Sequence, residues 1–484
     1  MEAAPVDFDT IVVGAGISGI NAGYRLQTQC PNRTYAIFEA RDNLGGTWDL
    51  FRYPGIRSDS DLHTFGFPWR PWTSDKTIGD AKSILAYMKE SAEMYGIDRK
   101  IHYKHKLLTA NWSSAAQAWT LTVDVAGEQK HFHARFLLMA TGYYDYKEPL
   151  PAVIPGLGKF EGQVIHPQFW PEDLDYTGKD IVIIGSGATA VTLLPNLADK
   201  AGHVTMLQRS PSYILSLPRV DKTATFLKKW LPLTWAYELI RLKYLILPLL
   251  FFKFCRQFPN AARKQLQSGA EKQLPPSVGI KPHFNPRYNP WEQRLCVCPS
   301  GDFYKALGRD NCDIVTAHID EITEKSIKLK DSSEVLHPDI IITATGLKIM
   351  LAGGATLSVD NQPININAKH LWKGAMIQDV PNACFVIGYT NASWTLGADA
   401  TAQLVTRFLN KMEKHGQTSV VPQLDAANDM KDMPVLNLNS TYVLKAEGEL
   451  PKAGSQKPWL PRSTYFTDMY EAKFGNITKC LKYT

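Results

Sequence analysis

Short apolar runs that end in glycine-rich turns recur along the chain. The first run, Thr10–Val13, is followed by apolar residues at helical spacing over Ile20–Gln27 and by a second run, Tyr35–Phe38, that ends at Glu39. The turn between the first run and the helix contains Gly14, Gly16, Ser18 and Gly19. This order predicts a strand, a tight turn, a helix and a second strand. Such a turn lets the backbone approach a pyrophosphate, which the N–H groups and dipole of the helix N-terminus then bind.

A second unit of the same kind begins with the apolar run Ile181–Ile184. Its turn contains Gly185, Gly187, Thr189 and Ala190. The next apolar run, His203–Leu207, leads into Arg209 and Ser210. One glycine turn alone is weak evidence, because such turns also occur in ordinary loops, but two in a strand-turn-helix context predict two dinucleotide sites.

The charges at the ends of the second strands distinguish the two sites. A carboxylate such as Glu39 accepts hydrogen bonds from a ribose 2′-OH and repels a 2′-phosphate, so the first site suits FAD or NAD. Arg209 pairs with a 2′-phosphate through its planar set of donors, so the second site suits NADPH. Just beyond Glu39, small residues and an aromatic wall for a bulky cofactor are supplied by Gly46, Thr47 and Trp48.

Changes of pattern along the chain set the domain limits. Runs rich in β-formers between Leu107 and Met139 indicate a small meander. The buried-strand pattern of Phe136–Gly142 is repeated at Ile340–Gly346, where we expect the chain to cross between domains. A helix-like, basic and aromatic stretch from about Lys222 to Gln293 indicates an insertion over the active site. We predict an α/β fold of two Rossmann-like domains, with an FAD-binding domain at 1–147 and 375–484, an NADP-binding domain at 148–216 and 293–374, and a helical insertion at 217–292.

Composition narrows the function classes without choosing one. The 484 residues, 44% hydrophobic and 21% charged, are typical of a globular protein of two or three domains. The net charge of +6 suits anionic ligands, but no basic run with interleaved aromatics indicates a nucleic-acid partner. Seven scattered cysteines without a CxxC pair favour free thiols in a reducing, cytoplasmic compartment, and we expect no metal site. The first strand begins soon after Met1, so no secretory signal is expected.

The most apolar stretch of the chain is Tyr244–Phe252. It is far shorter than a spanning helix and contains Pro248. Apolar side chains within residues 226–258, including Trp230, Trp235, Leu245, Phe251 and Phe252, are flanked by basic ones, which suits peripheral contact with a membrane surface. Packing of these side chains in the protein's own core is the alternative that we favour.

A more specific motif lies just before the second glycine turn. Phe160, Gly162, His166 and Trp170 fit the pattern FxGxxxHxxxWP, which resembles the fingerprint of type I Baeyer-Villiger monooxygenases. Segments 45–61, 94–98 and 388–394 are similar to the ethionamide-activating branch of that family, and the resemblance covers essentially the whole chain. We expect His166 to couple domain movement to catalysis from the linker, not to act as a general base.

The resemblance implies an enzyme that uses FAD, NADPH and O2. Members of the family insert one oxygen atom into ketones, giving esters or lactones through a C4a-peroxyflavin, and oxidise sulfides or thioamides. Arg294 matches their active-site arginine, which holds negative charge near the flavin, and Asp59 matches its carboxylate partner. Trp394 lies in a matching segment that leads into a helix whose N-terminus is aimed at the flavin. Gln293 replaces a common lysine, so coenzyme binding is either weaker or rests more heavily on Arg209.

Three other classes remain open. An N- or S-oxygenating flavin monooxygenase without physiological ketone oxidation uses the same cofactors. A flavin disulfide reductase shares both nucleotide folds but needs a redox-active cysteine pair, for which Cys296 and Cys298 have the wrong spacing. A non-catalytic FAD-binding protein is the third class, and such a protein would have no use for an NADPH site.

Overall fold

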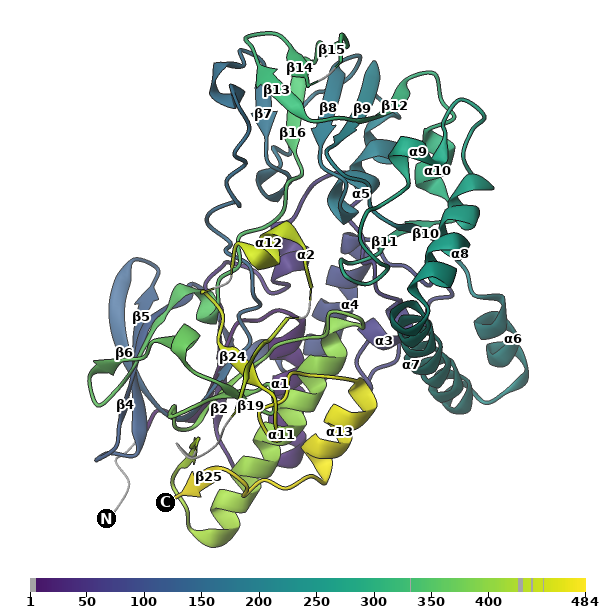
Figure 1. Ribbon diagram of the computed structural model, residues 1–484. Helices are drawn as coiled ribbons and strands as arrows, with labels where there is room; N and C mark the ends of the chain where they lie inside the picture. Colours follow the sequence, from purple (N-terminus) through teal and green to yellow (C-terminus); the bar gives the residue numbers. More distant parts are fainter. Residues whose placement is uncertain (1–5, 331, 425–429, 437, 447) are drawn as a thin grey trace.

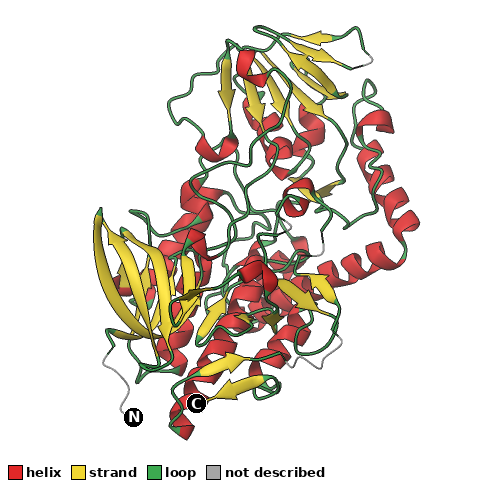
Figure 2. Ribbon diagram, turned by 60° about the vertical axis from the view of Figure 1, so that its left-hand side comes forward, coloured by secondary structure: helices red, strands yellow, loops and turns green. Residues whose placement is uncertain are grey.

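A computed structural model describes residues 6–330, 332–424, 430–436, 438–446 and 448–484. Residues 1–5, which enter the expectation that no secretory signal is present, lie outside the described residues. Two open sheets, each covered by helices, form the frame of the molecule (Figure 1). Figure 2 shows the sheets at opposite ends, with loops and helices filling the region between them.

The larger sheet is built around three parallel strands of the first glycine-turn unit. β1 (Phe8–Val13) pairs in parallel with both β2 (Tyr35–Phe38) and β6 (Glu128–Met139). Ile11 and Val12 at its centre are fully buried, because the sheet is covered on both faces. The sheet is completed by β3 (Ile101–His102), β4 (His105–Ser113), β5 (Ala118–Val125), β17 (Thr356–Val359), β18 (Gln362–Pro363) and β21 (Ala383–Phe385).

The predicted meander is present as β4, β5 and β6, which pair antiparallel in sequence order. Its last strand belongs to the core as well: the first part of β6 pairs with β5, and the part from Ala134 to Met139 pairs with β1. The meander is therefore an extension of the first sheet and not a separate layer.

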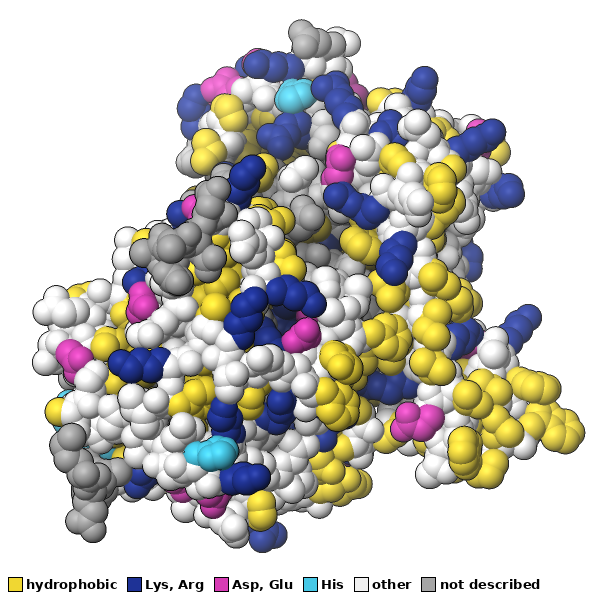
Figure 3. Space-filling view, turned by 60° about the horizontal axis from the view of Figure 1, so that its bottom comes forward, with side chains coloured by type: hydrophobic (Ala, Val, Ile, Leu, Met, Phe, Trp, Pro, Cys, Tyr) yellow, Lys and Arg dark blue, Asp and Glu magenta, His cyan; other side chains and the backbone are white. Residues whose placement is uncertain are grey.

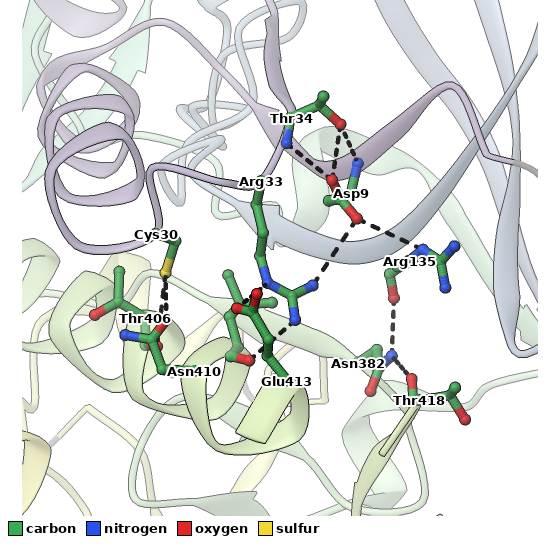
Figure 4. Close-up of polar contacts among 11 residues, drawn as sticks. Asp9, Cys30, Arg33, Thr34, Arg135, Asn382, Thr406, Asn410, Glu413 and Thr418 are labelled. Atoms are coloured by element: carbon green, nitrogen blue, oxygen red, sulfur yellow. Dashed lines mark hydrogen bonds and ion pairs between the residues drawn. The ribbon is translucent and has the colours of Figure 1, made fainter. Parts of the chain in front are cut away.

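Two long helices hold the chain's C-terminal part against the first unit. α1 (Ile17–Gln29) packs on α11 (Trp394–His415), and Arg25 pairs with the buried Asp399 at 2.8 Å. After α1, Arg33 lies 3.9 Å from Asp9 and 3.6 Å from Glu413 of α11 (Figure 4). Segments about 380 residues apart in the sequence are thus held together by these contacts.

One more helix, α4, is similar in length to α1, and several short elements complete this unit. The helices are α2 (Thr47–Leu50), α3 (Leu62–Phe65), α4 (Ala81–Met94), α12 (Thr441–Leu444) and α13 (Tyr465–Lys473). The strand pairs are β19 (Leu371–Trp372) with β20 (Met376–Ile377), β22 (Val420–Pro422) with β25 (Leu481–Tyr483), and β23 (Asp432–Pro434) with β24 (Lys452–Gly454).

The second sheet has five parallel strands in the order β12-β9-β8-β16-β7. They are β7 (Gln163–Ile165), β8 (Asp180–Ile184), β9 (His203–Gln208), β12 (Cys312–Thr316) and β16 (Ile340–Thr343). α5 (Ala188–Leu197) follows the second glycine turn and packs on the sheet. Apolar residues of the three-stranded sheet β13 (Ile319–Ile322), β14 (Ile327–Leu329) and β15 (Val335–Leu336) share a core cluster with β8 and β16. The predicted α/β fold with two Rossmann-like units is confirmed.

The chain crosses between the units after β6, at Ala140–Gly142, and after β16, at Ala344–Gly346, as the repeated pattern predicts. β17 already pairs with β4 of the first sheet. The predicted end of the NADP-binding domain at residue 374 therefore lies after the chain's actual return to the first sheet, which is complete by residue 356. The returning chain forms β17 and β18, two short strands at the edge of the first sheet. They contain too few residues for the sequence pattern to predict which sheet they join.

The helical insertion leaves and re-enters the second unit through two adjacent parallel strands, β10 (Ile214–Leu217) and β11 (Cys296–Pro299). It consists of α6 (Lys222–Trp230), α7 (Leu233–Gln257), α8 (Pro259–Glu271) and α9 (Ile280–His283), and α10 (Asp302–Ala306) follows β11. Within the described ranges, no helix is both long and apolar enough to cross a membrane.

The favoured expectation of core packing is wrong for two tryptophans of the insertion. Trp230 and Trp235 are 67% and 68% exposed. Leu245, Phe251 and Phe252 are half-buried. α7 thus has one apolar face toward solvent and another toward the protein, which the sequence pattern of a nearly all-apolar helix does not resolve.

Candidate active site

A cavity of about 1210 Å³ lies where the second sheet, the insertion and the C-terminal segment meet. It is lined from α7, from β11, from the second crossing at Ala344–Leu347 and from residues 390–393 and 464–466. The predicted site residues that line it are Asp59, Gly185, Gly187, Thr189, Arg209, Ser210 and Arg294. The cavity therefore joins the predicted NADPH site to the predicted catalytic pair.

The second glycine turn has one closed side and one open side. Gly185 has φ +144°, and a Cβ built there would lie 2.3 Å from the carbonyl oxygen of Ala344. A Cβ on Gly187 would meet no atom within 4 Å, so the turn is open toward the cavity. Ser186 Oγ donates to the Ser210 carbonyl at 2.8 Å, which holds the end of β9, with exposed Arg209, beside the turn. These features fit a dinucleotide with a 2′-phosphate.

At the first glycine turn a buried carboxylate faces the backbone. Glu39 is 6% exposed, and its two oxygens accept hydrogen bonds from the N–H groups of Ala15 at 2.8 Å and Arg41 at 3.0 Å. Burial raises the pKa of Glu39, against the effect of these N–H donors. Gly14 has φ +106°, and its Cβ would lie 2.7 Å from the Ala140 carbonyl oxygen. The predicted arrangement of turn and acidic residue is present, and it fits the ribose of FAD.

The loop that carries Gly46 and Thr47 lies directly on this first turn. The Gly45 N–H donates to the Ala15 carbonyl at 3.1 Å, and a Cβ on Gly46 would lie 3.2 Å from the Cα of Gly16. The first turn, including Gly19, and this loop therefore do not line the large cavity. The two predicted FAD-binding segments are thus in direct contact with each other.

Two predicted tryptophans lie around the same turn. Trp394, at the start of α11, donates from its ring nitrogen to Ser18 Oγ at 3.0 Å, and its ring stacks on Tyr143 at 4.8 Å. Trp48 packs edge-on against Phe65 at 5.5 Å. Trp394 thus connects the first glycine turn to Tyr143, whose hydroxyl contacts that of Tyr144 in the cavity wall.

The predicted catalytic arginine belongs to a cluster with three tyrosines. Arg294 Nη2 donates to the hydroxyl of Tyr143 at 3.5 Å, and the hydroxyls of Tyr143 and Tyr144 lie 2.5 Å apart. Tyr143 foremost, then Tyr442, Tyr144 and Asp59, raise the pKa of Arg294 despite the opposing effect of burial. The guanidinium therefore keeps its charge, and the Arg294 side chain is exposed in the wall of the cavity.

Among the described residues, Asp59 and Arg294 both line the cavity but do not form an ion pair with each other. Burial raises the pKa of Asp59 to about 6, opposed by the charge of Arg57, the N–H of Val297 and the charge of Arg294. Arg57 itself pairs with Asp302 at 2.6 Å. Within the described part of the chain, Asp59 and Arg294 form no ion pair at 4.0 Å or less. Their predicted partnership is an interaction through space in this conformation.

His166 of the fingerprint lies against the second interdomain crossing. Its Nε2 lies 3.2 Å from the carbonyl oxygen of Gly346, which lines the cavity, and its Nδ1 accepts from the Gln168 N–H at 3.3 Å. Burial lowers the pKa of His166, so the ring is neutral. Because His166 does not itself line the cavity, its position fits the linker role and not that of a general base.

The other fingerprint residues pack in the second unit. A Cβ on Gly162 would lie 2.5 Å from both the Asp339 carbonyl oxygen and the ring of Phe160. Trp170 is 9% exposed and belongs to the core cluster beneath α5. Ala190 is fully buried near the start of α5. These residues shape the unit that carries the cavity wall.

Sequence reasoning missed the tyrosines around Arg294, and it predicted the insertion over the site without the individual residues of the cavity wall. Tyr143 and Tyr144 directly follow the first crossing, so the small-residue pattern of that crossing was a usable signal. Tyr442 comes from a distant segment with no pattern of its own. The wall also includes Tyr244, Leu245, Leu247, Pro248, Leu249 and Phe251 of α7.

Comparison with known proteins identifies the family. The family model "Pyridine nucleotide-disulphide oxidoreductase" matches residues 11–218, which include both glycine turns. The chain is 46% identical over 470 residues to the FAD-containing monooxygenase EthA of Mycobacterium tuberculosis, covering 97% of this chain and 96% of the relative. The protein belongs to the FAD-containing monooxygenases. It is also 44% identical over 462 residues to the probable FAD-binding monooxygenase AlmA of Acinetobacter baylyi, covering 95% and 92%.

Solved structures share the fold of this FAD-containing monooxygenase. OTEMO in complex with FAD and NADP superposes with a TM-score of 0.76 at 20% identity, covering 99% of this chain and 100% of that one. An oxidised steroid monooxygenase bound to NADP gives 0.76 at 21% identity, covering 98% and 99%. The comparisons confirm the family resemblance, the fold and the predicted class of FAD-dependent monooxygenase. The two predicted cofactors are bound together in the OTEMO structure.

Proposed function

We propose that the protein uses NADPH and O2 to insert one oxygen atom into a ketone, giving an ester or lactone, and that it also oxidises sulfides or thioamides. The observation that carries this proposal is the position of Arg294, a fixed cation in the same cavity as the open second glycine turn. Bound FAD supplies the acceptor for the hydride of NADPH and the site of oxygen activation.

The residues of the second unit hold and orient the coenzyme. Arg209 pairs with its 2′-phosphate, and the open face of Gly187 admits its pyrophosphate to the N-terminus of α5. Among described residues, no side chain caps that helix N-terminus, so its N–H groups remain available to phosphate oxygens. At the first turn, Glu39 and the tryptophans Trp48 and Trp394 supply the matching contacts for FAD.

Arg294 performs the electrostatic part of the reaction. Its permanent charge stabilises the negative charge that develops on oxygen when a ketone carbonyl is attacked. Asp59 adds a negative charge beside it, and Tyr143 fixes the guanidinium through a hydrogen bond. Leu245, Leu249 and other apolar side chains of α7 reduce the water content of the cavity, which strengthens these interactions.

The competing classes are distinguished by particular residues. Burial raises the pKa of both Cys296 and Cys298, that of Cys298 to about 12, so neither thiol is poised as the thiolate that a disulfide reductase needs. Both lie in β11 at positions i and i+2, so their side chains share one face of the strand, where they are buried as free thiols in the core of the second unit. An N- or S-oxygenating enzyme without ketone oxidation is the stronger alternative, because it shares both dinucleotide sites.

A product screen tests the proposal. The holoenzyme is supplied with NADPH, O2 and linear, cyclic or aryl ketones, and separately with sulfides, and products are identified by gas chromatography. Ester or lactone from at least one ketone supports oxygen insertion. Sulfoxide without any ester identifies the S-oxygenating alternative, and a yellow protein that NADPH fails to bleach identifies a non-catalytic FAD-binding protein.

The same proposal places the enzyme in the cytoplasm, in peripheral contact with a membrane through residues 226–258. All seven cysteines are free, as expected in a reducing compartment. The exposed tryptophans of the insertion provide the apolar contact.

A further inference from the structure

One face of α7 presents an apolar stripe to solvent. Its members follow one another at intervals of three or four residues, so they share a face of the helix. They are Trp235, Leu239, Leu242, Ile246 and Leu250, exposed by 68%, 42%, 44%, 37% and 55%. Soluble proteins rarely leave so many large apolar side chains exposed together, and such a patch marks an interaction site. We call these five residues the α7 stripe.

The other side of α7 belongs to the cavity. Tyr244, Pro248 and Phe251 line the cavity wall. Leu247 lies between the two faces: it lines the cavity and is 52% exposed. Phe466 of α13 also lines the cavity and is 42% exposed. Each of these two apolar side chains belongs to the cavity wall and also reaches solvent, and we call the pair the rim.

The neighbouring helix α6 extends the apolar surface. Phe226 and Trp230 are 60% and 67% exposed, and their rings lie 6.3 Å apart. Hydrophobic side chains gather along the projecting right-hand flank of the molecule in Figure 3, on the side that carries α6 and α7 in Figure 1. The surface is therefore broad and projects from the body, unlike a single exposed side chain.

Basic residues surround this apolar surface. Residues 222–257 contain one acidic side chain, Glu238, against the basic ones Lys222, Lys228, Lys229, Arg241, Lys243, Lys253 and Arg256. Lys228 and Lys243 pair with Asp75 and Asp221. Lys222, Lys229, Lys253 and Arg256 are exposed. Apolar side chains bordered by exposed cations complement the interface of an anionic bilayer, which offers both acyl chains and negative headgroups.

We propose that the surface of α6 and the α7 stripe docks on an anionic bilayer, and that substrate dissolved in that bilayer reaches the cavity through the rim of Leu247 and Phe466. Docking places the rim beside the acyl chains, so an apolar substrate passes from lipid to cavity without crossing water. The access route rests on the proposed monooxygenase function, whereas docking does not.

Vesicle flotation tests the docking. The holoenzyme is mixed with vesicles of phosphatidylcholine alone or of phosphatidylcholine with phosphatidylglycerol, and the floating fraction is measured. We expect binding to the mixed vesicles that weakens as salt is raised. A double variant, Trp230→Ser with Trp235→Ser, lowers the partition coefficient about tenfold or more. Lys229→Glu with Lys253→Glu lowers binding to mixed vesicles only.

Matched exposed residues elsewhere serve as controls. Met94 is 63% exposed at the end of α4, far along the chain from the insertion, so Met94→Ser should float like the wild type. Equal flotation of the wild type and the double tryptophan variant overturns the proposal. A second outcome also overturns the proposal: the wild type is a dimer that does not bind vesicles, and the double variant is a monomer. A second copy of the chain would then cover the surface.

Turnover in the presence of mixed vesicles tests the access route. For a long-chain ketone dissolved in the bilayer, the double tryptophan variant should raise the apparent KM about tenfold. For a short, water-soluble ketone its kcat/KM should match the wild type, because neither tryptophan lines the cavity. An unchanged KM for the bilayer-dissolved ketone overturns the route. Absence of any ester would refute the proposed reaction while flotation still reports docking.

Discussion

Arg294 and Tyr143 are joined by a hydrogen bond of 3.5 Å from a guanidinium nitrogen to the phenol oxygen. Arg294 lies two residues before β11 of the second unit, whereas Tyr143 follows the crossing that leaves the first. The ring of Tyr143 also stacks on Trp394, which hydrogen-bonds the first glycine turn at Ser18. The predicted catalytic cation is therefore positioned by a chain of contacts that reaches the predicted FAD site.

Tyr143→Phe should remove the hydrogen bond and leave the stacking. We expect ketone oxygenation to fall about tenfold, the effect of losing one hydrogen bond to a charged group. FAD content and NADPH-dependent bleaching should stay unchanged. The decisive measurement is ester formed per NADPH consumed, since a purely structural role of Tyr143 would not alter this ratio. Tyr176→Phe, in a half-buried tyrosine beside Trp170, is the matched control.

Arg294→Ala should abolish oxygen insertion more severely. Loss of a preorganised charge at the reacting oxygen costs about 100- to 1000-fold in kcat. Because Arg294 hydrogen-bonds Tyr143 and, among the described residues, neither glycine turn, bound FAD and the rate of flavin reduction by NADPH should persist. Arg309→Ala, which removes a surface pair with Asp199, should behave as the wild type. Ester formation retained by the Arg294 variant would remove this residue from the proposed role.

The parallel cores of both sheets could be predicted from the sequence, because their strands are short, uninterrupted apolar runs beside glycine turns. β2 coincides with the predicted run Tyr35–Phe38, and β8 extends the predicted run by one residue, at Asp180. The edge strands β17 and β18 could not be assigned, since nothing local records which sheet a two- to four-residue strand joins.

The candidate site was predictable where a sequence motif contains the site residues. It was not predictable where distant segments meet only in the folded structure. Arg209 and Gly187 follow from the strand-turn-helix pattern, and the structure brings them to one cavity. Tyr442 reaches the neighbourhood of Arg294 from a distant segment, which no spacing rule anticipates. Similarly, the two apolar faces of α7 are indistinguishable in a helix whose sequence is apolar almost all round.

Asp59 should make activity and stability respond to pH in opposite directions. Its pKa of about 6 in the folded protein lies above the ordinary value of 3.8, so the folded state binds this proton more tightly than the unfolded state. The contribution of Asp59 to stability therefore grows as pH falls through 6 toward 4 and is lost above 6. Activity should fall over the same range, because protonation removes the negative charge beside Arg294.

Asp59→Asn should separate these effects. At about pH 7.5 the variant should gain about 1–3 kcal/mol in the free energy of unfolding, since an uncharged side chain escapes the cost of burying the carboxylate. Its oxygenation rate should fall and should no longer change near pH 6. Thermal melts and kcat measured across this range are the test, and a variant that keeps the wild-type pH profile would assign the titration to another group.

Arg209→Ala should reduce the preference for NADPH over NADH. The variant loses a bidentate contact to the 2′-phosphate, so KM for NADPH should rise about 10- to 100-fold while that for NADH changes little. The measurement is the ratio of kcat/KM for the two coenzymes. Lys305→Ala, at an exposed site on α10, controls for a general change of charge. An unaltered ratio would mean that the 2′-phosphate is recognised elsewhere.

Gly185 and Gly187 provide a matched pair, because the same added methyl group meets different surroundings. Gly185→Ala places a Cβ 2.3 Å from a backbone carbonyl at φ +144°, so we expect poor folding, with about 2–4 kcal/mol lost. Gly187 has φ −81° and open space, so Gly187→Ala should keep its melting temperature and FAD content. Its methyl group occupies the space through which a pyrophosphate approaches, and KM for NADPH should rise about tenfold or more. A folded Gly187→Ala variant with unchanged KM would show that the coenzyme does not bind at this turn.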